Sequence, residues 1–311
     1  MKKSASIRLG VGAATVALLL TACGGGSGVS GSKGGTLYII SNAEQILHLD
    51  PQRNYTGEDL AFASGYLNRT LTQYALNKDN NEASKLVADL ATDTGTASND
   101  SKSWAFTLRD GVKWQDGSAV TCDDVKYGVS RTFATDIITD GPTYAISLLD
   151  IPQNADGSSQ YAGPYKGTGQ ALFDKAVTCD GNKITFNLAK PAADFNYTVT
   201  LSAFAPVQKA KDTGEKYDDN VQSNGPYMIE SYKKKSKMVL VRNPNWSSSN
   251  DSLRPAFPDR IEYQFSVPEA LVTERLMQDS GNDSMTISPD SIDPTKLAAV
   301  FAGAQYKDCL L

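Results

Sequence analysis

The chain has 311 residues, of which 40% are hydrophobic and 21% charged, a composition that fits a globular protein of about two domains. Residues 1–22 contain three basic residues and no acidic one, so the rest of the chain carries 27 basic and 35 acidic residues, a net charge of −8. This balance argues against a nucleic-acid-binding protein, and the lysines at 233–235 are expected at an exposed hairpin tip.

The first 22 residues are organised like a signal peptide. A basic start precedes an apolar run from Leu9 to Leu20, which is shorter than the roughly 20 residues that a membrane-spanning helix needs. Residues 20–23 (LTAC) resemble the bacterial lipobox, whose cysteine is diacylated and becomes the mature N-terminus. A glycine-rich tether follows at 24–35. We therefore expect an extracytoplasmic protein anchored to the cell membrane through lipid on Cys23.

Hydrophobic periodicity predicts alternating strands and helices in the remainder. Strands are predicted at 36–40, 104–108, 184–188, 227–232, 237–242 and 261–265. Helices are predicted at 58–76, 82–90, from 121 onward and at 268–279. Thr121 and Asp124 have the spacing of a capping box, and Val125, Val129 and Phe133 would share one face of the helix that it opens. This pattern indicates a mixed α/β protein with antiparallel strands.

The cysteines and the single histidine limit the chemistry. Export makes a disulfide plausible, and Cys122 and Cys179 would lie at one end of a sheet if strands 104–108 and 184–188 pair antiparallel. Two buried free thiols are the alternative, with Cys309 as the spare cysteine. His48 precedes the turn at 49–51 and is interpreted as structural. The cysteine spacings match no zinc motif, so neither a metal nor a cofactor is expected.

Residues 103–131 carry a resemblance to a known family. They read SWAFTLRDGVKWQDGSAVTCDDVKYGVSR, which closely resembles the signature of the family 5 extracellular solute-binding proteins, the peptide- and oligopeptide-binding components of ABC importers. Residues 224–246 and the Leu-Asp-Pro at 49–51 resemble two further blocks of this family. The long block is interpreted as architectural, with Arg109 and Arg131 expected to pair with carboxylates rather than to touch ligand.

The resemblance implies an α/β protein with a two-lobed, type II periplasmic-binding-protein-like fold built from mixed sheets. The expected divisions are a signal peptide at 1–22, a lipidated Cys and tether at 23–35, a first lobe at 36–283 with an inserted α/β subdomain at about 75–205, and the start of a second lobe at 284–311. In this family the segment before Leu-Asp-Pro lines the ligand cleft, which makes Asn42, Ala43 and Glu44 the candidate ligand-binding residues.

The expected function is the capture of peptides and their delivery to an ABC permease by a monomeric protein that is not an enzyme. Because members of this family are markedly longer, a C-terminal truncation that removes most of the second lobe is expected. Three alternatives remain open: another solute of the family (an oligosaccharide, nickel or haem), a non-functional gene fragment, and a secreted hydrolase. The hydrolase is disfavoured because the sequence has no Gly-x-Ser-x-Gly nucleophile elbow.

Overall fold

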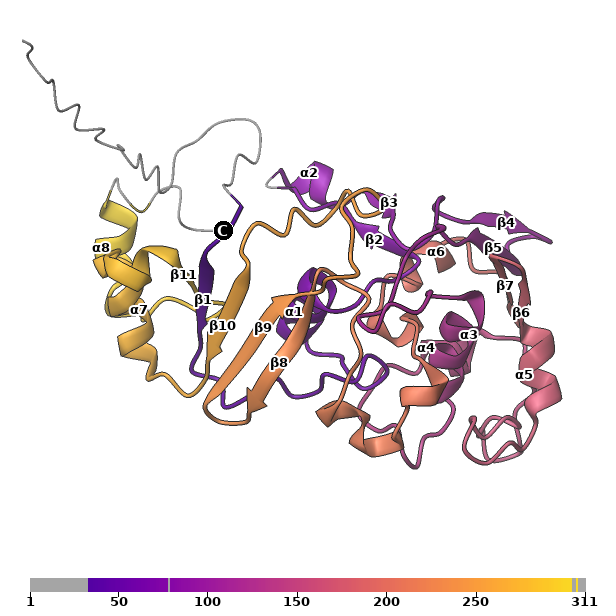
Figure 1. Cartoon of the computed structure of the whole chain (residues 1–311). Helices are drawn as coiled ribbons and strands as arrows, with labels where there is room; N and C mark the ends of the chain where they lie inside the picture. Colours follow the sequence, from indigo (N-terminus) through magenta and orange to yellow (C-terminus); the bar gives the residue numbers. More distant parts are fainter. Residues whose placement is uncertain (1–32, 78, 304–305, 307–311) are drawn as a thin grey trace, which may run out of the picture.

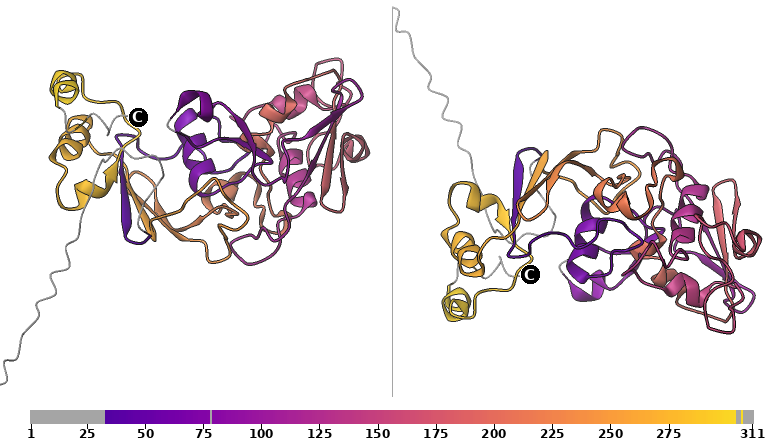
Figure 2. Two further views of the ribbon diagram at one scale, coloured as in Figure 1. Left: turned by 90° about the horizontal axis from the view of Figure 1, so that it is seen from above. Right: turned by 90° about the horizontal axis from the view of Figure 1, so that it is seen from below.

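The computed structural model describes residues 33–77, 79–303 and 306. The predicted signal peptide, the predicted lipidation site Cys23 and the spare cysteine Cys309 lie outside these residues. Figure 1 shows a five-stranded sheet towards one end of the molecule and a four-stranded sheet at the other, with helix α1 (Gly57–Tyr66) between them. The views in Figure 2, from above and below, show the same order.

The five-stranded sheet combines parallel and antiparallel pairs of strands. Its order is β11 (Thr286–Ile287), β1 (Thr36–Ile40), β10 (Arg260–Gln264), β9 (Lys237–Arg242) and β8 (Tyr227–Lys233). Strand β1 is parallel to β10 and to β11, whereas β10, β9 and β8 pair antiparallel. The predicted strands of this sheet are confirmed. Residues 234–236 form the exposed turn between β8 and β9, so that two of the three lysines lie in the turn and Lys233 ends β8.

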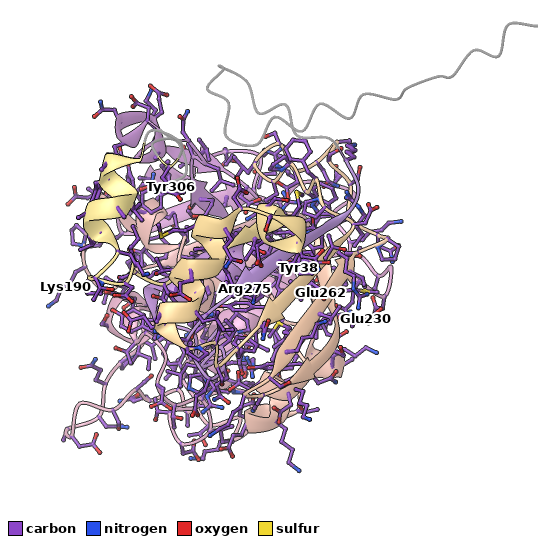
Figure 3. All side chains as sticks on the ribbon, turned by 90° about the vertical axis from the view of Figure 1, so that its left-hand side faces the viewer. Tyr38, Lys190, Glu230, Glu262, Arg275 and Tyr306 are labelled. Atoms are coloured by element: carbon purple, nitrogen blue, oxygen red, sulfur yellow. A yellow bond between two sulfur atoms is a disulfide. The ribbon has the colours of Figure 1, made fainter. Side chains whose placement is uncertain are left out.

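The two faces of this sheet differ in polarity because side chains alternate along each strand. Ile39 and Tyr263 point towards α1 and belong to one buried core. The opposite face carries Tyr38, Glu262 and Glu230. Figure 3 shows Tyr38 and Glu262 near Arg275 of α7 (Glu269–Gln278), and Glu230 farther along the sheet. On that face Arg260 bonds both glutamates, at 2.9 Å to Glu230 and 3.0 Å to Glu262. These half-exposed ion pairs contribute little to stability.

The four-stranded sheet is antiparallel and forms the scaffold of the second core. Its order is β4 (Thr96–Ser98), β5 (Ser103–Thr107), β7 (Lys183–Asn187) and β6 (Val177–Asp180). Trp104 of β5 lies opposite Phe186 of β7, which confirms the predicted pairing of these two strands. This core draws its members from residues 71–204, and the other main core from residues 39–67 and 207–265.

Helix α3 (Cys122–Arg131) packs on this second core through a predicted stripe. Val125, Val129 and Phe133 are all buried in it. The capping box is confirmed with an aspartate in place of the usual glutamate: the Thr121 hydroxyl accepts the Asp124 N–H at 3.2 Å, and the Asp124 carboxylate accepts the Thr121 N–H at 2.9 Å. Local sequence therefore fixes where this helix begins.

The remaining elements are short. They are the hairpin strands β2 (Thr72–Tyr74) and β3 (Leu86–Ala88), the helices α2 (Asn80–Ala83), α4 (Tyr144–Leu148), α5 (Gln170–Ala176), α6 (Phe195–Thr198) and α8 (Leu297–Ala302), and the 3-10 turns η1 (Ser202–Phe204), η2 (Lys209–Lys211), η3 (Gly214–Asp219) and η4 (Gly281–Met285). Across the described ranges, none of the helices is both long and apolar enough to cross a bilayer.

Two predicted helices are wrong in extent. The helix predicted at 58–76 ends at Tyr66, because the Leu67 carbonyl accepts the N–H groups of Asn224 and Gly225. The Arg69 N–H likewise donates to the Asn224 side chain at 2.9 Å, so the chain turns away and continues as β2. The helix predicted at 82–90 is replaced by the single turn α2 followed by β3, which pairs with β2. In both places pairing with distant residues outweighs the local helical pattern.

The structure joins Cys122 and Cys179 in a disulfide, with Cα atoms 5.9 Å apart. This is the pairing that the sequence predicted. Cys122 is the first residue of α3 and Cys179 lies in the edge strand β6, so the bond fastens the helix to the margin of the four-stranded sheet.

Candidate ligand-binding site

The carboxyl ends of β1, β10 and β11 meet at one edge of the five-stranded sheet. The chain runs from β10 through α7 to β11, and so passes from one side of β1 to the other. Ligands of open α/β sheets bind outside the carboxyl ends of parallel strands, at such a change in strand order. This edge is therefore the part of the fold to examine for a site.

Residues 41–44 follow β1. Hydrogen bonds to the segments that follow β10 and β11, the two neighbours of β1, hold them at this edge. The Ser41 hydroxyl donates to one oxygen of Asp290 at 2.7 Å, and the Asn42 N–H donates to the other at 2.6 Å. The Ala43 carbonyl accepts the Ser266 N–H at 2.9 Å. The Asp290 carboxylate therefore links the ends of β1 and β11.

The three candidate residues from the sequence lie in this segment but differ in their surroundings. Ala43 is half-buried and lines a groove. Asn42 and Glu44 are exposed and are not among the lining residues. The Glu44 carboxylate pairs instead with Lys235 of the β8–β9 turn, at 2.7 Å. Ligand contact by the side chains of Asn42 and Glu44 stays a prediction.

The groove has a volume of about 1120 Å³ and lies between α1 and the apolar face of the sheet. Most of its walls come from four segments: β1 with the loop that follows it, α1 with the residue before it, residues 254–258 and residues 287–289. Leu76, Pro226, Tyr227 and Tyr263 complete the lining. Most lining side chains are apolar or aromatic, and the largest of these are Leu37, Ile39, Ile46, Leu47, Phe62, Tyr66, Leu76, Tyr227, Phe257, Tyr263 and Ile287. A concave, mainly apolar site is the usual form of a pocket for an organic ligand.

A buried ionic network supports the wall formed by residues 254–258. The Arg254 guanidinium donates to Asp89 at 2.8 Å and to Asp251 at 3.2 Å, and Arg69 donates to Asp89 at 2.8 Å. Burial opposes ionisation of Asp89, but Arg254 and Arg69 outweigh it and hold the pKa of that carboxyl below its usual range. The Arg254 Nε–H also donates to the Ser64 carbonyl at 2.6 Å, which ties this wall to α1.

The phenols that face the groove stay neutral. Burial raises the pKa of Tyr227 and of Tyr263 to about 12, and it also raises the pKa of Tyr66. These rings therefore present apolar faces and hydrogen-bonding hydroxyls to the groove, without charge.

The only histidine of the chain belongs to the support of the loop and not to the groove lining. His48 Nδ1 lies 2.6 Å from Asp218, whose carboxylate also accepts the backbone N–H groups of Leu49 and Asp50 at 2.7 and 2.8 Å and bonds Arg53 at 3.0 Å. This arrangement agrees with the structural role expected for His48.

The long signature block at 103–131 is architectural, as predicted, with one correction. Arg131 is fully buried and forms a two-pronged ion pair with Asp50, at 2.7 and 2.6 Å, which joins α3 to the Leu-Asp-Pro turn. Arg109 does not pair with a carboxylate in the described structure: its Nε–H donates to the backbone carbonyl of Asp89 at 2.7 Å. Neither arginine lines the groove.

The sequence pattern missed several residues that form the site. Asp290 follows a strand of two residues, too short to give a periodic signal. Arg254 lies in an irregular segment, and α1 has apolar residues all round, so its groove-facing side could not be told from its core-facing side. The one usable signal was the pair of turn residues Pro289 and Asp290.

Comparison with known proteins identifies the family of the chain. The model of the bacterial extracellular solute-binding proteins, family 5 Middle, matches residues 85–305. The probable D,D-dipeptide-binding periplasmic protein DdpA of Escherichia coli is 27% identical over 225 residues, which is 70% of this chain and 38% of that protein. The oligopeptide-binding protein OppA of Bacillus subtilis is 26% identical over 245 residues, 74% of this chain and 41% of that protein.

Solved structures agree on the fold. The clavulanic acid biosynthesis oligopeptide binding protein 2 is similar with a TM-score of 0.78 and 31% identity, over 89% of this chain and 48% of that one. The murein tripeptide binding protein MppA of Escherichia coli gives a TM-score of 0.65 at 23% identity, over 86% and 48%, and shows likeness of fold alone. The chain thus spans less than half the length of these relatives.

The described residues have the mixed α/β architecture of type II periplasmic binding proteins. The family match covers more than half of the chain and includes the signature block, α3 and the strands from β6 to β11. The chain belongs to the bacterial extracellular solute-binding proteins of family 5.

Proposed function

We propose that this chain is the extracytoplasmic solute-binding component of an ABC importer, which captures peptides and delivers them to a membrane permease. The observation that carries the proposal is the groove of about 1120 Å³ at the carboxyl ends of β1, β10 and β11, in a chain of this family. The names of several relatives support peptides as the solute: D,D-dipeptide-binding, murein peptide-binding and oligopeptide-binding.

The dimensions and lining of the groove favour an extended ligand. Pockets for compact small molecules usually measure about 300–1000 Å³, so this groove has room for more than one amino-acid side chain. Edge strand β11 ends at the groove, and an extended peptide can pair its backbone with such an edge. Apolar walls then accept side chains of different shapes, with water completing the remaining hydrogen bonds.

Closure on the ligand requires a second wall. We place the first lobe at 36–283, with its inserted subdomain at about 75–205, and the start of the second lobe at 284. The chain spans less than half the length of its relatives. The second lobe, which starts at 284, would form the wall opposite to the groove. Hinge closure of the two lobes would then bury the peptide.

We further propose that the protein works as a lipid-anchored monomer outside the cytoplasm. A diacylated Cys23 would hold it at the membrane, and the tether at 24–35 would let the folded part reach the permease. No catalytic role is proposed. Among residues 33–77, 79–303 and 306, no group of three or more His, Cys, Asp or Glu side chains is placed to hold a metal ion.

The test is a ligand screen with a matched pair of variants. Thermal-shift measurements on the mature chain would compare pooled tri- to hexapeptides with oligosaccharides, Ni²⁺ and haem. Ala43→Phe fills the groove, whereas Ala97→Phe places the same ring on the exposed edge strand β4. We expect peptides to raise the Tm of the parent chain and of the Ala97 variant but not of the Ala43 variant. Stabilisation by another solute class and not by peptides would overturn the proposal.

A further inference from the structure

Strand β11 is the least secured wall of the groove. It has two residues, and its pairing with β1 comprises two positions, Tyr38 with Thr286 and Ile39 with Ile287. It also lies at the edge of the sheet, so within the described structure no strand supports its other side. A segment with so few backbone hydrogen bonds opens readily. Residues 287–289, which line the groove, therefore need a further attachment to keep their place.

The loop after β1, which forms another wall, is secured by its own backbone. The carbonyls of Ser41 and Ala43 accept the N–H groups of Val267 and Ser266, each at 2.9 Å. Both donors follow β10, so these bonds fix the loop to the antiparallel half of the sheet. The loop is thus a firm point to which the weaker strand β11 can be attached.

Asp290 makes this attachment. Its Oδ1 accepts the Ser41 hydroxyl at 2.7 Å, and its Oδ2 accepts the Asn42 N–H at 2.6 Å. Hydrogen bonds to a carboxylate are about twice as strong as those between neutral groups. Ser41 is fully buried and Asp290 is half-buried, so water competes only in part for these bonds. Asp290 is not itself among the residues that line the groove.

The segment around Asp290 has few other ties to the first lobe. On either side it is attached to α7: Asp283 bonds Arg275 at 2.7 Å, and the Asp293 N–H donates to the Thr273 hydroxyl at 2.9 Å. The other side-chain hydrogen bonds of the described residues 284–292 stay within residues 281–290. Between these two attachments, the sheet therefore holds the segment through the short strand β11 and through the carboxylate of Asp290.

We propose that Asp290 is a positioning residue of the binding site. Its carboxylate holds residues 287–289 against the loop after β1, and so fixes the width of the groove at the carboxyl ends of β1 and β11. Asp290 acts through this wall and does not touch the ligand. The inference rests on the proposed function, since it takes the groove as the ligand site. Because the second lobe is placed from 284 onward, the same clasp sets where that lobe leaves the first one.

The expected effects follow from the strength of the clasp. A hydrogen bond to a charged group corresponds to about a ten- to hundredfold factor in an equilibrium constant. Asn42 is exposed, so removal of its acceptor should speed the hydrogen exchange of its N–H by about this factor. A wall that keeps its binding position for a smaller fraction of the time weakens ligand binding in proportion, so the Kd should rise about tenfold.

The experiment compares Asp290→Ala and Asp290→Asn with the control Asp293→Ala. Asn at 290 keeps an oxygen that can accept the Asn42 N–H, and so is the conservative variant. Asp293 is also half-buried and its carboxylate also accepts two hydrogen bonds, but both come from Thr295 in its own segment. Amide hydrogen exchange is measured by NMR on the mature chain carrying Cys23→Ser, and the same samples are titrated with the peptide Leu-Leu-Ala.

In Asp290→Ala we expect faster exchange at Asn42 and in β11, unchanged exchange at Ser266 and Val267, and a Kd for Leu-Leu-Ala that is about tenfold higher. Asp290→Asn should recover part of both effects, and Asp293→Ala should match the parent. If Asp290→Ala does not fold, Asp290→Asn carries the same test with smaller effects.

Three results would overturn the inference while leaving the proposed function standing: unchanged exchange in β11, an equal rise at Ser266 and Val267, or an unchanged Kd. The first would show that β11 needs no clasp, the second that the whole loop loosens, and the third that the width of the groove does not depend on Asp290. If neither Leu-Leu-Ala nor the peptide pools bind the parent, the proposed function fails, whereas the exchange rates in β11 still decide whether Asp290 positions this wall.

Discussion

Replacing Arg254 by Met tests the ionic support of the groove wall. The substitution keeps much of the side-chain volume and removes the guanidinium, which donates to Asp89, Asp251 and the Ser64 carbonyl. Asp89 is completely buried and would keep only Arg69 as a cationic partner. Removing one partner of a buried ion pair costs about 3–5 kcal/mol in the free energy of unfolding, because it leaves a charge without compensation in the interior.

The pH dependence has a definite sign. The pKa of Asp89 lies below its usual value in the folded protein, so its contribution to stability is present above the unfolded pKa of about 4 and is lost as the pH falls through the folded pKa. Without Arg254 the folded pKa of Asp89 rises. The cost of the substitution should therefore be greatest at pH 7 and should shrink as the pH falls below about 4.

Urea unfolding followed by circular dichroism at pH 7 and at pH 3.5 measures this difference. The control is Arg260→Met, which removes a half-exposed arginine from two surface ion pairs and should cost less than about 1 kcal/mol at both pH values. Adding Asp89→Asn to the Arg254 variant removes the orphaned charge and should recover part of the loss. A cost below about 1 kcal/mol at pH 7, or a cost that does not change with pH, would refute the account of this network.

Three further predictions concern other parts of the chain. Replacing Cys122 and Cys179 together by Ala opens a loop of 57 residues and should lower the free energy of unfolding by up to about 4 kcal/mol; an unchanged urea midpoint would contradict this. Cys23→Ser should move the protein from the membrane fraction to the soluble fraction and abolish an acyl adduct in intact-mass analysis, whereas retention in the membrane would disprove lipidation there. Gly128→Ala should destabilise by about 1 kcal/mol or more although Ala favours helices, since the added Cβ would overlap the Ala205 carbonyl; a higher Tm would show that this contact yields.

Much of the architecture follows from short-range sequence. A short apolar run predicted β1, a polar turn between two segments predicted the β8–β9 hairpin, and alternating side chains predicted β5 and β7. The pair Thr121 and Asp124 set the start of α3. The predicted antiparallel pairing of β5 with β7 led to the disulfide of the structure, Cys122 with Cys179. The strands and the helix start depend on residues that are a few positions apart, so local sequence patterns are enough to predict them. The pairing of β5 with β7 could be predicted because both strands have a regular alternating pattern.

The site depended on contacts that no local pattern encodes. The sequence placed Ala43 near the ligand by resemblance, but Asp290, which holds the same loop, is separated from Ser41 by 249 positions. The helix predicted at 58–76 stopped at Tyr66 because Asn224, far along the chain, offers partners to Leu67 and Arg69. A hydrogen bond between distant residues in a buried place outweighs a helix propensity of a few tenths of a kcal/mol per residue. Only the tertiary structure could therefore decide which side of α1 faces the groove.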